Sequence, residues 1–188
     1  QLLFINLLTD SLPAIAIGME QPQGDLLNEK PRSRTASILD KAFVKEIAFE
    51  GFIMSVFVII AFHLGNKIDA NYASTMAFAT LCLARLFHGF SCRGNSSLFT
   101  LGFFKNKTSW YAFAFGAILL NLVLFIPAIG NIFEASILSM NQIGSIYGLA
   151  LAPTVIIQIV KIIKDILSNK NNQKSNNSSV NTDVEKAA

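Results

Sequence analysis

The stretch that decides the fold is residues 108–133, TSWYAFAFGAILLNLVLFIPAIGNIF, which holds no Asp, Glu, Lys or Arg. Residues 135–160, ASILSMNQIGSIYGLALAPTVIIQIV, are equally free of formal charge. Because a helix rises about 1.5 Å per residue, about 20 apolar residues cross the roughly 30 Å hydrocarbon core of a bilayer. Both stretches are therefore predicted to span a membrane as helices.

The whole chain has the composition of a membrane protein. Of its 188 residues, 52% are hydrophobic and 14% are charged, against about 25% charged in ordinary soluble domains. This composition argues against a soluble enzyme. The formal net charge of +3 is small and its charges are scattered, so nucleic acid is not expected as a partner. Cys82 and Cys92 lie about 15 Å apart along one predicted helix and are not expected to form a disulfide.

Five apolar segments of helical length follow one another along the chain. They cover residues 1–19, 43–64, 72–90, 110–129 and 143–163. The strands of a β-barrel would instead alternate in polarity over about 10 residues. We therefore expect an all-α, polytopic bundle of five transmembrane helices in the lipid bilayer.

The segments outside the spans differ in character. Residues 20–42 form a long polar connection, and four spans with their loops then occupy residues 43–165. Residues 166–188 are rich in Asn, Ser and Lys, bury too little apolar area to offset chain entropy, and are predicted to be a disordered tail. The chain starts at Gln1, inside an apolar segment and without an initiator Met, which we interpret as the cut end of a longer protein.

The positive charges predict the orientation of the spans. Most of the 15 Lys and Arg residues lie between residues 30 and 45, between residues 93 and 107, or from residue 161 onward, whereas Lys67 lies on the opposite side. Connections rich in Lys and Arg stay on the cytoplasmic face. We therefore expect a multi-pass protein of the cell membrane with a cytoplasmic C-terminus.

The first span carries polar residues on one helical face. Asn6, Thr9 and Asp10 are spaced i, i+3 and i+4, which places them together about half-way across the bilayer. An aspartate at that depth costs roughly 2.5–3.5 kcal/mol and is rare without a partner or a function. Pro13 has no N–H for the carbonyl four residues back, that of Thr9. These hard oxygen ligands suit calcium and, less specifically, sodium, potassium, manganese or a proton.

Two interpretations of this face stay open on spacing alone. The first is a cation site. The second is a polar contact between helices, in which Asn6 and Thr9 bond to neighbouring helices and Asp10 pairs with a cation such as Arg85 in the third span.

The string around this face resembles a known family. Residues 6–18, NLLTDSLPAIAIG, followed by Glu20 and Pro22, resemble the sixth transmembrane helix of calcium-transporting P-type ATPases, whose signature is N-L-x-T-D-x-L-P-A-x-A-L/I-G. Shorter likenesses continue to about residue 165: KPRS at 30–33, IL at 38–39, TMAF at 75–78, SLF at 97–99, GFF at 102–104, and Pro153 with IVK at 159–161. The resemblance implies helices six to ten of a ten-helix transport domain, and the short outer loops favour a bacterial member.

The resemblance also implies the roles of individual residues. In that family the residues matching Asn6, Thr9 and Asp10 coordinate the transported calcium, with Asp10 central. Further ligands are expected on helices four and five, and the Asp-Lys-Thr-Gly-Thr phosphorylation motif and the domains that bind Mg-ATP are expected elsewhere in the parent. These missing helices and cytoplasmic domains are the implied partners. The chain alone is not expected to hydrolyse ATP.

Arg85 departs from the pattern of two-site calcium pumps. Reticulum-type pumps hold a glutamate ten residues after the threonine that matches Thr75, and this glutamate helps to form one of two calcium sites. Arginine has no acceptor and stays protonated, so it cannot ligate a metal. We expect Arg85 to modulate the site as a tethered cation beside Asp10, which gives one calcium per cycle. The alternative is that Arg85 extends along the third span toward the cytoplasm.

Other polar residues inside the spans are assigned structural roles. Glu46 and Glu50 are expected to be hydrated or paired with Lys45, and His88 is expected to be interfacial. Two amides are expected to form hydrogen bonds between helices: Asn121 and Gln158.

Two other functions stay open beside calcium export. The oxygen ligands do not discriminate strongly, so the same family could transport manganese, sodium or another cation. A function of another class is a non-enzymatic membrane scaffold or small channel formed by these five helices alone.

Overall fold

The structure is a computed structural model that describes residues 10–20, 40–94 and 96–187. Within these ranges it contains helices and turns and no strand, in agreement with the predicted all-α class. The helices are α2 (Ser11–Gly18), α3 (Lys41–Asn66), α4 (Ala70–Ser91), α5 (Leu98–Leu101), α6 (Lys107–Phe125), α7 (Pro127–Ile132) and α8 (Met140–Ala187).

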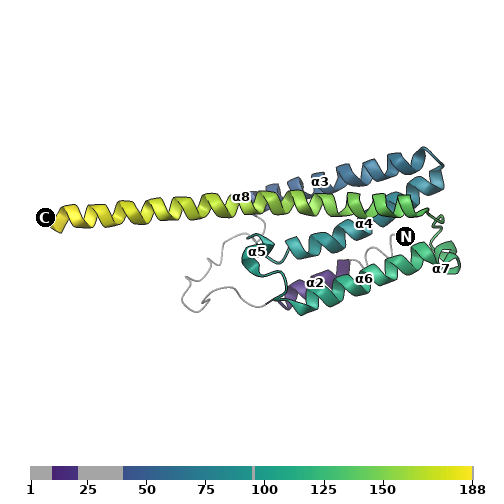
Figure 1. The fold of residues 1–188 in the computed structure, drawn as a ribbon, viewed down its shortest axis with the longest axis horizontal. Coiled ribbons are helices and arrows are strands. Elements are labelled where there is room, and N and C mark those ends of the chain that lie inside the picture. The colour runs from purple at the N-terminus through teal and green to yellow at the C-terminus, as the bar shows by residue number, and fades with distance from the viewer. Residues whose placement is uncertain (1–9, 21–39, 95, 188) are drawn as a thin grey trace.

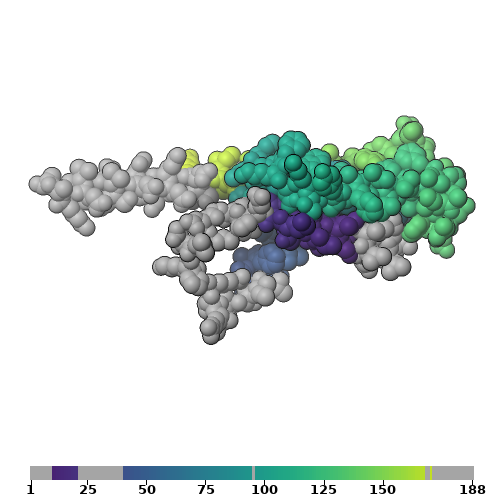
Figure 2. All heavy atoms as spheres, turned by 90° about the horizontal axis from the view of Figure 1, so that it is seen from below, coloured from purple at the N-terminus to yellow at the C-terminus, as the bar shows by residue number. Residues whose placement is uncertain are grey.

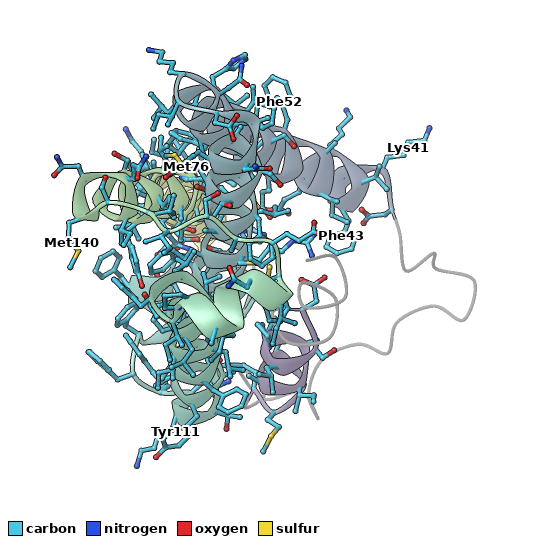
Figure 3. The ribbon with its side chains drawn as sticks, turned by 90° about the vertical axis from the view of Figure 1, so that its right-hand side faces the viewer. Lys41, Phe43, Phe52, Met76, Tyr111 and Met140 are labelled. Carbon is cyan, nitrogen blue, oxygen red and sulfur yellow. The ribbon has the colours of Figure 1, made fainter. Side chains whose placement is uncertain are left out.

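Helix α4 is the centre of the bundle. It packs against α3 and α8 on one side and against α2 and α6 on the other (Figure 1). In the view along the bundle, Met76 of α4 lies among the helices, whereas Phe52 and Tyr111 point outward (Figure 3). The buried core is contributed mainly by α4, α6 and α8 and includes Met76, Ala79, Cys82, Leu83, Leu120, Val123, Ile146 and Ala150.

Three helices of the described residues are long and apolar enough to cross a membrane: α3, α6 and the part Met140–Leu167 of α8. The predicted count of five spans is not confirmed. The described part of α2 has 8 residues, and polar residues such as Thr75, Arg85 and His88 lower the mean hydropathy of α4. Because α4 is surrounded by other helices, protein shields some of its polar groups: Thr75 and Thr80 are both buried.

Local sequence signals move the ends of α6 from the predicted span 110–129. The helix begins before residue 110 because the Asn106 side chain accepts a hydrogen bond from Ser109 N over 3.0 Å, which satisfies a free N–H of the first turn. It ends before Ile126, whose extended conformation (φ −100°, ψ 107°) is the one favoured directly before a proline. Pro127 then begins α7, where its missing N–H is not needed.

Helix α8 continues past the predicted end of the last span at residue 163. The structure describes it as one helix from Met140 to Ala187 (Figure 1). No Pro or Gly follows Pro153, so no helix-breaking residue ends the helix earlier. This helical backbone differs from the irregular tail expected for residues 166–188, and the disorder of that polar segment in solution stays a prediction.

Gly65 allows α3 and α4 to meet at their shared turn. A Cβ at this position would lie 2.6 Å from Ala73 Cα and 2.7 Å from Ala73 N. We expect Gly65→Ala to push the helices apart and to cost about 1–3 kcal/mol of unfolding free energy, read as a lower midpoint of thermal unfolding of the full-length protein in detergent. Gly51→Ala in the same helix, where nothing lies within 4 Å of the added Cβ, should be neutral or slightly stabilising. Equal losses in both variants would contradict the packing argument.

Candidate ion-binding site

One of the residues predicted to bind the ion, Asp10, lies directly before α2. Asn6 and Thr9 lie outside the described residues, as do residues 21–39 of the predicted polar connection. Asp10 is described and has helical φ −99° and ψ −44° directly before α2. Pro13 lies in the first turn of α2, where the carbonyl that it cannot bond is that of Thr9. Of the three predicted ligands, Asp10 is therefore the one whose surroundings can be described.

Asp10 is paired with Arg85 of α4. Arg85 Nη1 donates to Asp10 Oδ2 over 2.5 Å, between residues 75 positions apart in the chain. The Arg85 and Asp10 side chains are 34% and 45% exposed, because α2 lies at the surface of the described part of the chain (Figure 2). The predicted contact between Asp10 and Arg85 is present, and it turns Arg85 toward α2 instead of along its own span.

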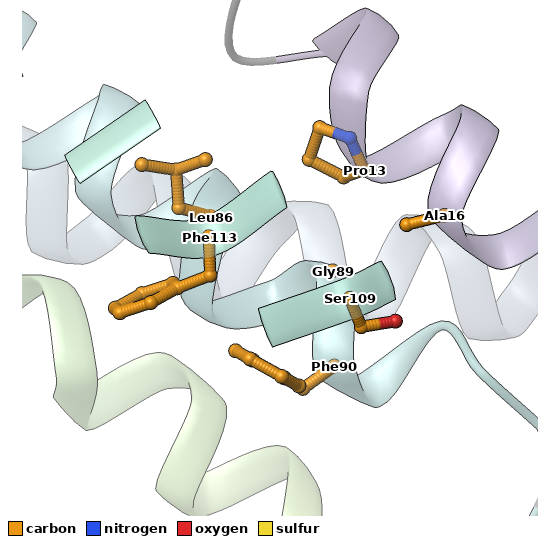
Figure 4. A pocket seen from close by; sticks show the side chains of 7 residues that line it. All are labelled: Pro13, Ala16, Leu86, Gly89, Phe90, Ser109 and Phe113. Carbon is orange, nitrogen blue, oxygen red and sulfur yellow. The ribbon is translucent and has the colours of Figure 1, made fainter. Parts of the chain in front are cut away.

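Helix α2 approaches α4 closely next to this ion pair. A Cβ built on Gly89 would lie 3.1 Å from Pro13 Cβ, so glycine lets the proline ring rest on α4. Pro13 and Ala16 line a cavity of about 10 Å³ with residues of α4 and α6 (Figure 4), which is the lower limit for one water molecule. The Ser109 hydroxyl also lines this cavity and has no hydrogen-bond partner among the described residues.

A second ion pair holds the C-terminal end of α2. Arg93, whose side chain is 0% exposed, donates Nε and Nη2 to the two carboxylate oxygens of Glu20, each over 2.8 Å. Asn106 Nδ2 donates to Glu20 Oε2 over 2.6 Å and to Ala16 O over 3.0 Å. The hydrogen bonds from Arg93 hold the pKa of Glu20 below its ordinary value of 4.5. The ion pair of Glu20 with Arg93 therefore stabilises the fold fully at neutral pH, and this stabilisation is lost only as the pH falls through the lowered pKa of Glu20.

Helix α8 holds the connection between α4 and α6 from the other side. Gln158 Nε2 donates to Ser91 Oγ over 2.9 Å, which confirms the predicted hydrogen bond between helices. Lys161 Nζ donates to Ser91 O over 2.6 Å and so satisfies a carbonyl at the end of α4. Asp165 Oδ2 accepts from Ser97 N over 2.8 Å. The connection is therefore fixed between α8 and the end of α2.

Two further ion pairs join α3 to its neighbours at the same end of the bundle. Glu50 Oε2 lies 3.3 Å from His88 Nε2 of α4, and Glu46 Oε1 lies 3.5 Å from Lys164 Nζ of α8. The sequence predicts that both glutamates are hydrated or paired with Lys45. Lys45 directly precedes Glu46, and adjacent residues of a helix do not face each other. In the structure, residues of other helices pair with both glutamates instead. Spacing along the sequence gives no signal for either pair.

The described residues alone do not complete a metal site. No group of three or more His, Cys, Asp or Glu among them lies close enough to hold a metal ion. Calcium takes about six to eight oxygen ligands, and Asp10 supplies two oxygen atoms, one of which accepts from Arg85. A calcium site at Asp10 would therefore need further oxygen ligands besides the two of this carboxylate.

Comparison with known proteins adds an independent line of evidence. Residues 1–163 match the family described as "Cation transporting ATPase, C-terminus". The chain is 36% identical over 171 residues to a calcium-transporting ATPase of Listeria monocytogenes, which covers 88% of this chain and 19% of that protein. It is 34% identical over 160 residues to a calcium-transporting ATPase of Bacillus subtilis, which covers 84% of this chain and 18% of that protein. It is 32% identical over 178 residues to calcium-transporting ATPase type 2C member 2 of Mus musculus, which covers 89% of this chain and 18% of that protein. The chain thus spans about a fifth of the length of these relatives.

Proposed function

Because the chain belongs to the family of cation-transporting ATPases, as part of their C-terminal region, we propose that it forms part of the membrane domain of an ATP-driven pump that exports calcium from the cytoplasm. The names of the relatives from Listeria monocytogenes and Bacillus subtilis support calcium as the ion. In this proposal, Mg-ATP binding and phosphorylation belong to the part of the parent pump that this chain does not include. The chain alone does not hydrolyse ATP.

Asn6, Thr9 and Asp10 are the proposed calcium ligands, with Asp10 at the centre. Their amide oxygen, hydroxyl and carboxylate are the hard oxygen donors that calcium prefers. Because Pro13 has no N–H to donate to the carbonyl of Thr9, that carbonyl oxygen is a further proposed ligand. The ion pair of Asp10 with Arg85 is also expected for a polar contact between helices, so support for calcium binding comes from the chemistry of these oxygen atoms and from the names of the relatives.

The ion pair between Arg85 and Asp10 is the observation that carries the proposal of one calcium per cycle. A guanidinium cannot be deprotonated in a protein and has no acceptor, so it cannot serve as a calcium ligand. At 2.5 Å from Asp10 Oδ2, Arg85 supplies a permanent positive charge where a second ion would otherwise balance the carboxylate. Arg85 thus modulates the site as a tethered cation and leaves Asp10 Oδ1 for a single calcium ion.

The end of the bundle that contains Glu20 and Arg93 is proposed to face the cytoplasm, together with the C-terminus. Helices α2 and α8 both contact the connection between α4 and α6 at this end. Lys105 and Lys107, in and directly after that connection, therefore lie at the same end as Lys164. A common cytoplasmic side for these cations fits the distribution of Lys and Arg in membrane proteins.

Ion uptake tests the choice of calcium. Inside-out vesicles that contain the full-length parent pump are expected to accumulate calcium when Mg-ATP is added, and to take up calcium faster than sodium or manganese, because the relatives from Listeria monocytogenes and Bacillus subtilis are named as calcium-transporting ATPases. The same vesicles without ATP are the control. Preferred uptake of manganese or sodium would assign another cation to the pump, and calcium movement that needs no ATP would indicate a channel.

A further inference from the structure

Three residues at the C-terminal end of α2 form a compact polar unit, which we name the α2 anchor: Glu20, Arg93 and Asn106. All three nitrogens of the Arg93 guanidinium donate hydrogen bonds. Nε and Nη2 donate to the two carboxylate oxygens of Glu20, and Nη1 donates to Gly102 O and Phe103 O, each over 3.3 Å. Asn106 is equally occupied, since its Oδ1 accepts from Ser109 N while its Nδ2 donates to Glu20 and to α2. The anchor is thus a fully bonded, largely buried unit.

The base of the α2 anchor is fixed. Arg93 and Asn106 belong to the connection between α4 and α6, and α8 holds that connection through Lys161 and Asp165. Asn106 also caps α6. The backbone carbonyls that Arg93 bonds include that of Gly102, whose φ of +82° is a conformation that glycine adopts without strain. The anchor therefore ties α2 to a rigid part of the bundle.

The α2 anchor and the candidate ligand lie at opposite ends of one short helix. Asp10 precedes α2 and Glu20 follows its C-cap residue Met19, so the 8 residues of this helix, about 12 Å in length, lie between them. Between them, Pro13 rests on Gly89, and at the first end Asp10 meets Arg85. A short helix held at both ends cannot slide or rotate against α4 without breaking one of these contacts. The position of the Asp10 carboxylate thus depends on contacts that never touch the ion.

We propose that Glu20, Arg93 and Asn106 position Asp10 against Arg85 and thereby set the apparent calcium affinity of the pump. This inference rests on the proposed function. When the anchor is weakened, α2 spends less time with Asp10 in its binding position, and apparent affinity falls in proportion to the competent fraction. These are positioning residues, so the calcium concentration needed for half-maximal activity changes while the maximal rate at saturating calcium is kept.

The test measures ATP hydrolysis by the full-length parent pump as a function of free calcium. Glu20→Gln is expected to raise the half-maximal calcium concentration about tenfold, because it removes the charge from hydrogen bonds to a buried cation. Its maximal rate is expected to stay within about twofold of wild type. Arg93→Lys keeps the charge but loses the bidentate hydrogen bonds to Glu20, and it should raise the half-maximal calcium concentration by a smaller factor. Glu46→Gln is the matched control, since Glu46 pairs with Lys164 at the same end of the bundle without contacting α2.

The variants also separate positioning from general damage. If Glu20 and Arg93 act as one unit, Glu20→Gln combined with Arg93→Lys should shift the half-maximal calcium concentration by less than the product of the two single shifts. If Glu20→Gln does not fold, the half-maximal calcium concentration of Arg93→Lys is compared with that of Glu46→Gln instead. The proposal for the α2 anchor would be overturned if both single variants had the same half-maximal calcium concentration as Glu46→Gln. In that case the pump still needs calcium, and the proposed function stands. A wild-type pump whose ATP hydrolysis does not respond to calcium would instead overturn the proposed function.

Discussion

Asp10→Asn is expected to abolish calcium-dependent ATP hydrolysis by the full-length parent pump. Asparagine keeps the size of the side chain but removes the negative charge that calcium needs from its central ligand. It also leaves Arg85, which donates to Asp10 over 2.5 Å, without its counter-charge. Together these losses should lower activity at micromolar calcium at least about 100-fold, since each lost charged contact corresponds to roughly tenfold or more.

Asp69→Asn is the matched control for this experiment. Asp69 caps the first turn of α4, where its Oδ2 accepts from Asn71 N over 3.2 Å, and asparagine is an equally good cap. Its activity should therefore equal that of wild type. An Asp10→Asn pump that still hydrolyses ATP in response to calcium would move the ion site elsewhere and leave Asp10 as a structural partner of Arg85.

Arg85→Ala is expected to destabilise the full-length pump, and Asp10→Asn is expected to rescue much of the loss. Removing the guanidinium leaves the Asp10 carboxylate without a partner. Because the two side chains are 34% and 45% exposed in the described part of the chain, the expected cost is about 1–3 kcal/mol, less than for a fully buried pair. The double variant contains no unpaired charge and should be more stable than Arg85→Ala alone.

The midpoint of thermal unfolding in detergent measures this rescue. Lys164→Ala is the control, since Lys164 pairs with Glu46 over 3.5 Å and its side chain is 59% exposed. Such a pair contributes at most about 1 kcal/mol. If Arg85→Ala unfolds at the same temperature as Lys164→Ala, or if Asp10→Asn makes Arg85→Ala worse, Arg85 does not balance the charge of Asp10.

The sequence predicts contacts best where a polar residue stands in an apolar segment. Asp10 and Arg85 are costly in a membrane unless they find partners, and the structure pairs them. The same reasoning holds for Asn121, whose Nδ2 donates to Tyr147 OH of α8 over 2.6 Å, and for Gln158 with Ser91. In each case the free-energy cost of an unbonded polar group in a membrane predicts that a contact exists, although it does not always identify the partner.

The partners in other ion pairs could not be predicted in this way. Glu20 and Arg93 lie in polar segments, where a charge needs no partner, and 73 residues separate them. Glu50 and His88 meet because α3 packs on α4, which no spacing in the sequence specifies. The central position of α4 could not be predicted from the sequence either. A helix that packs against four others tolerates polar residues, and these residues lower its hydropathy as in a weaker membrane span.

The number of calcium ions bound per pump tests the role of Arg85 most directly. Equilibrium binding of radioactive calcium to the purified full-length pump, counted per molecule that can be phosphorylated, is expected to give one ion for wild type. Arg85→Glu is expected to give two, because a carboxylate replaces the tethered cation beside Asp10. Two ions bound by wild type would contradict the proposal that Arg85 takes the place of one of them.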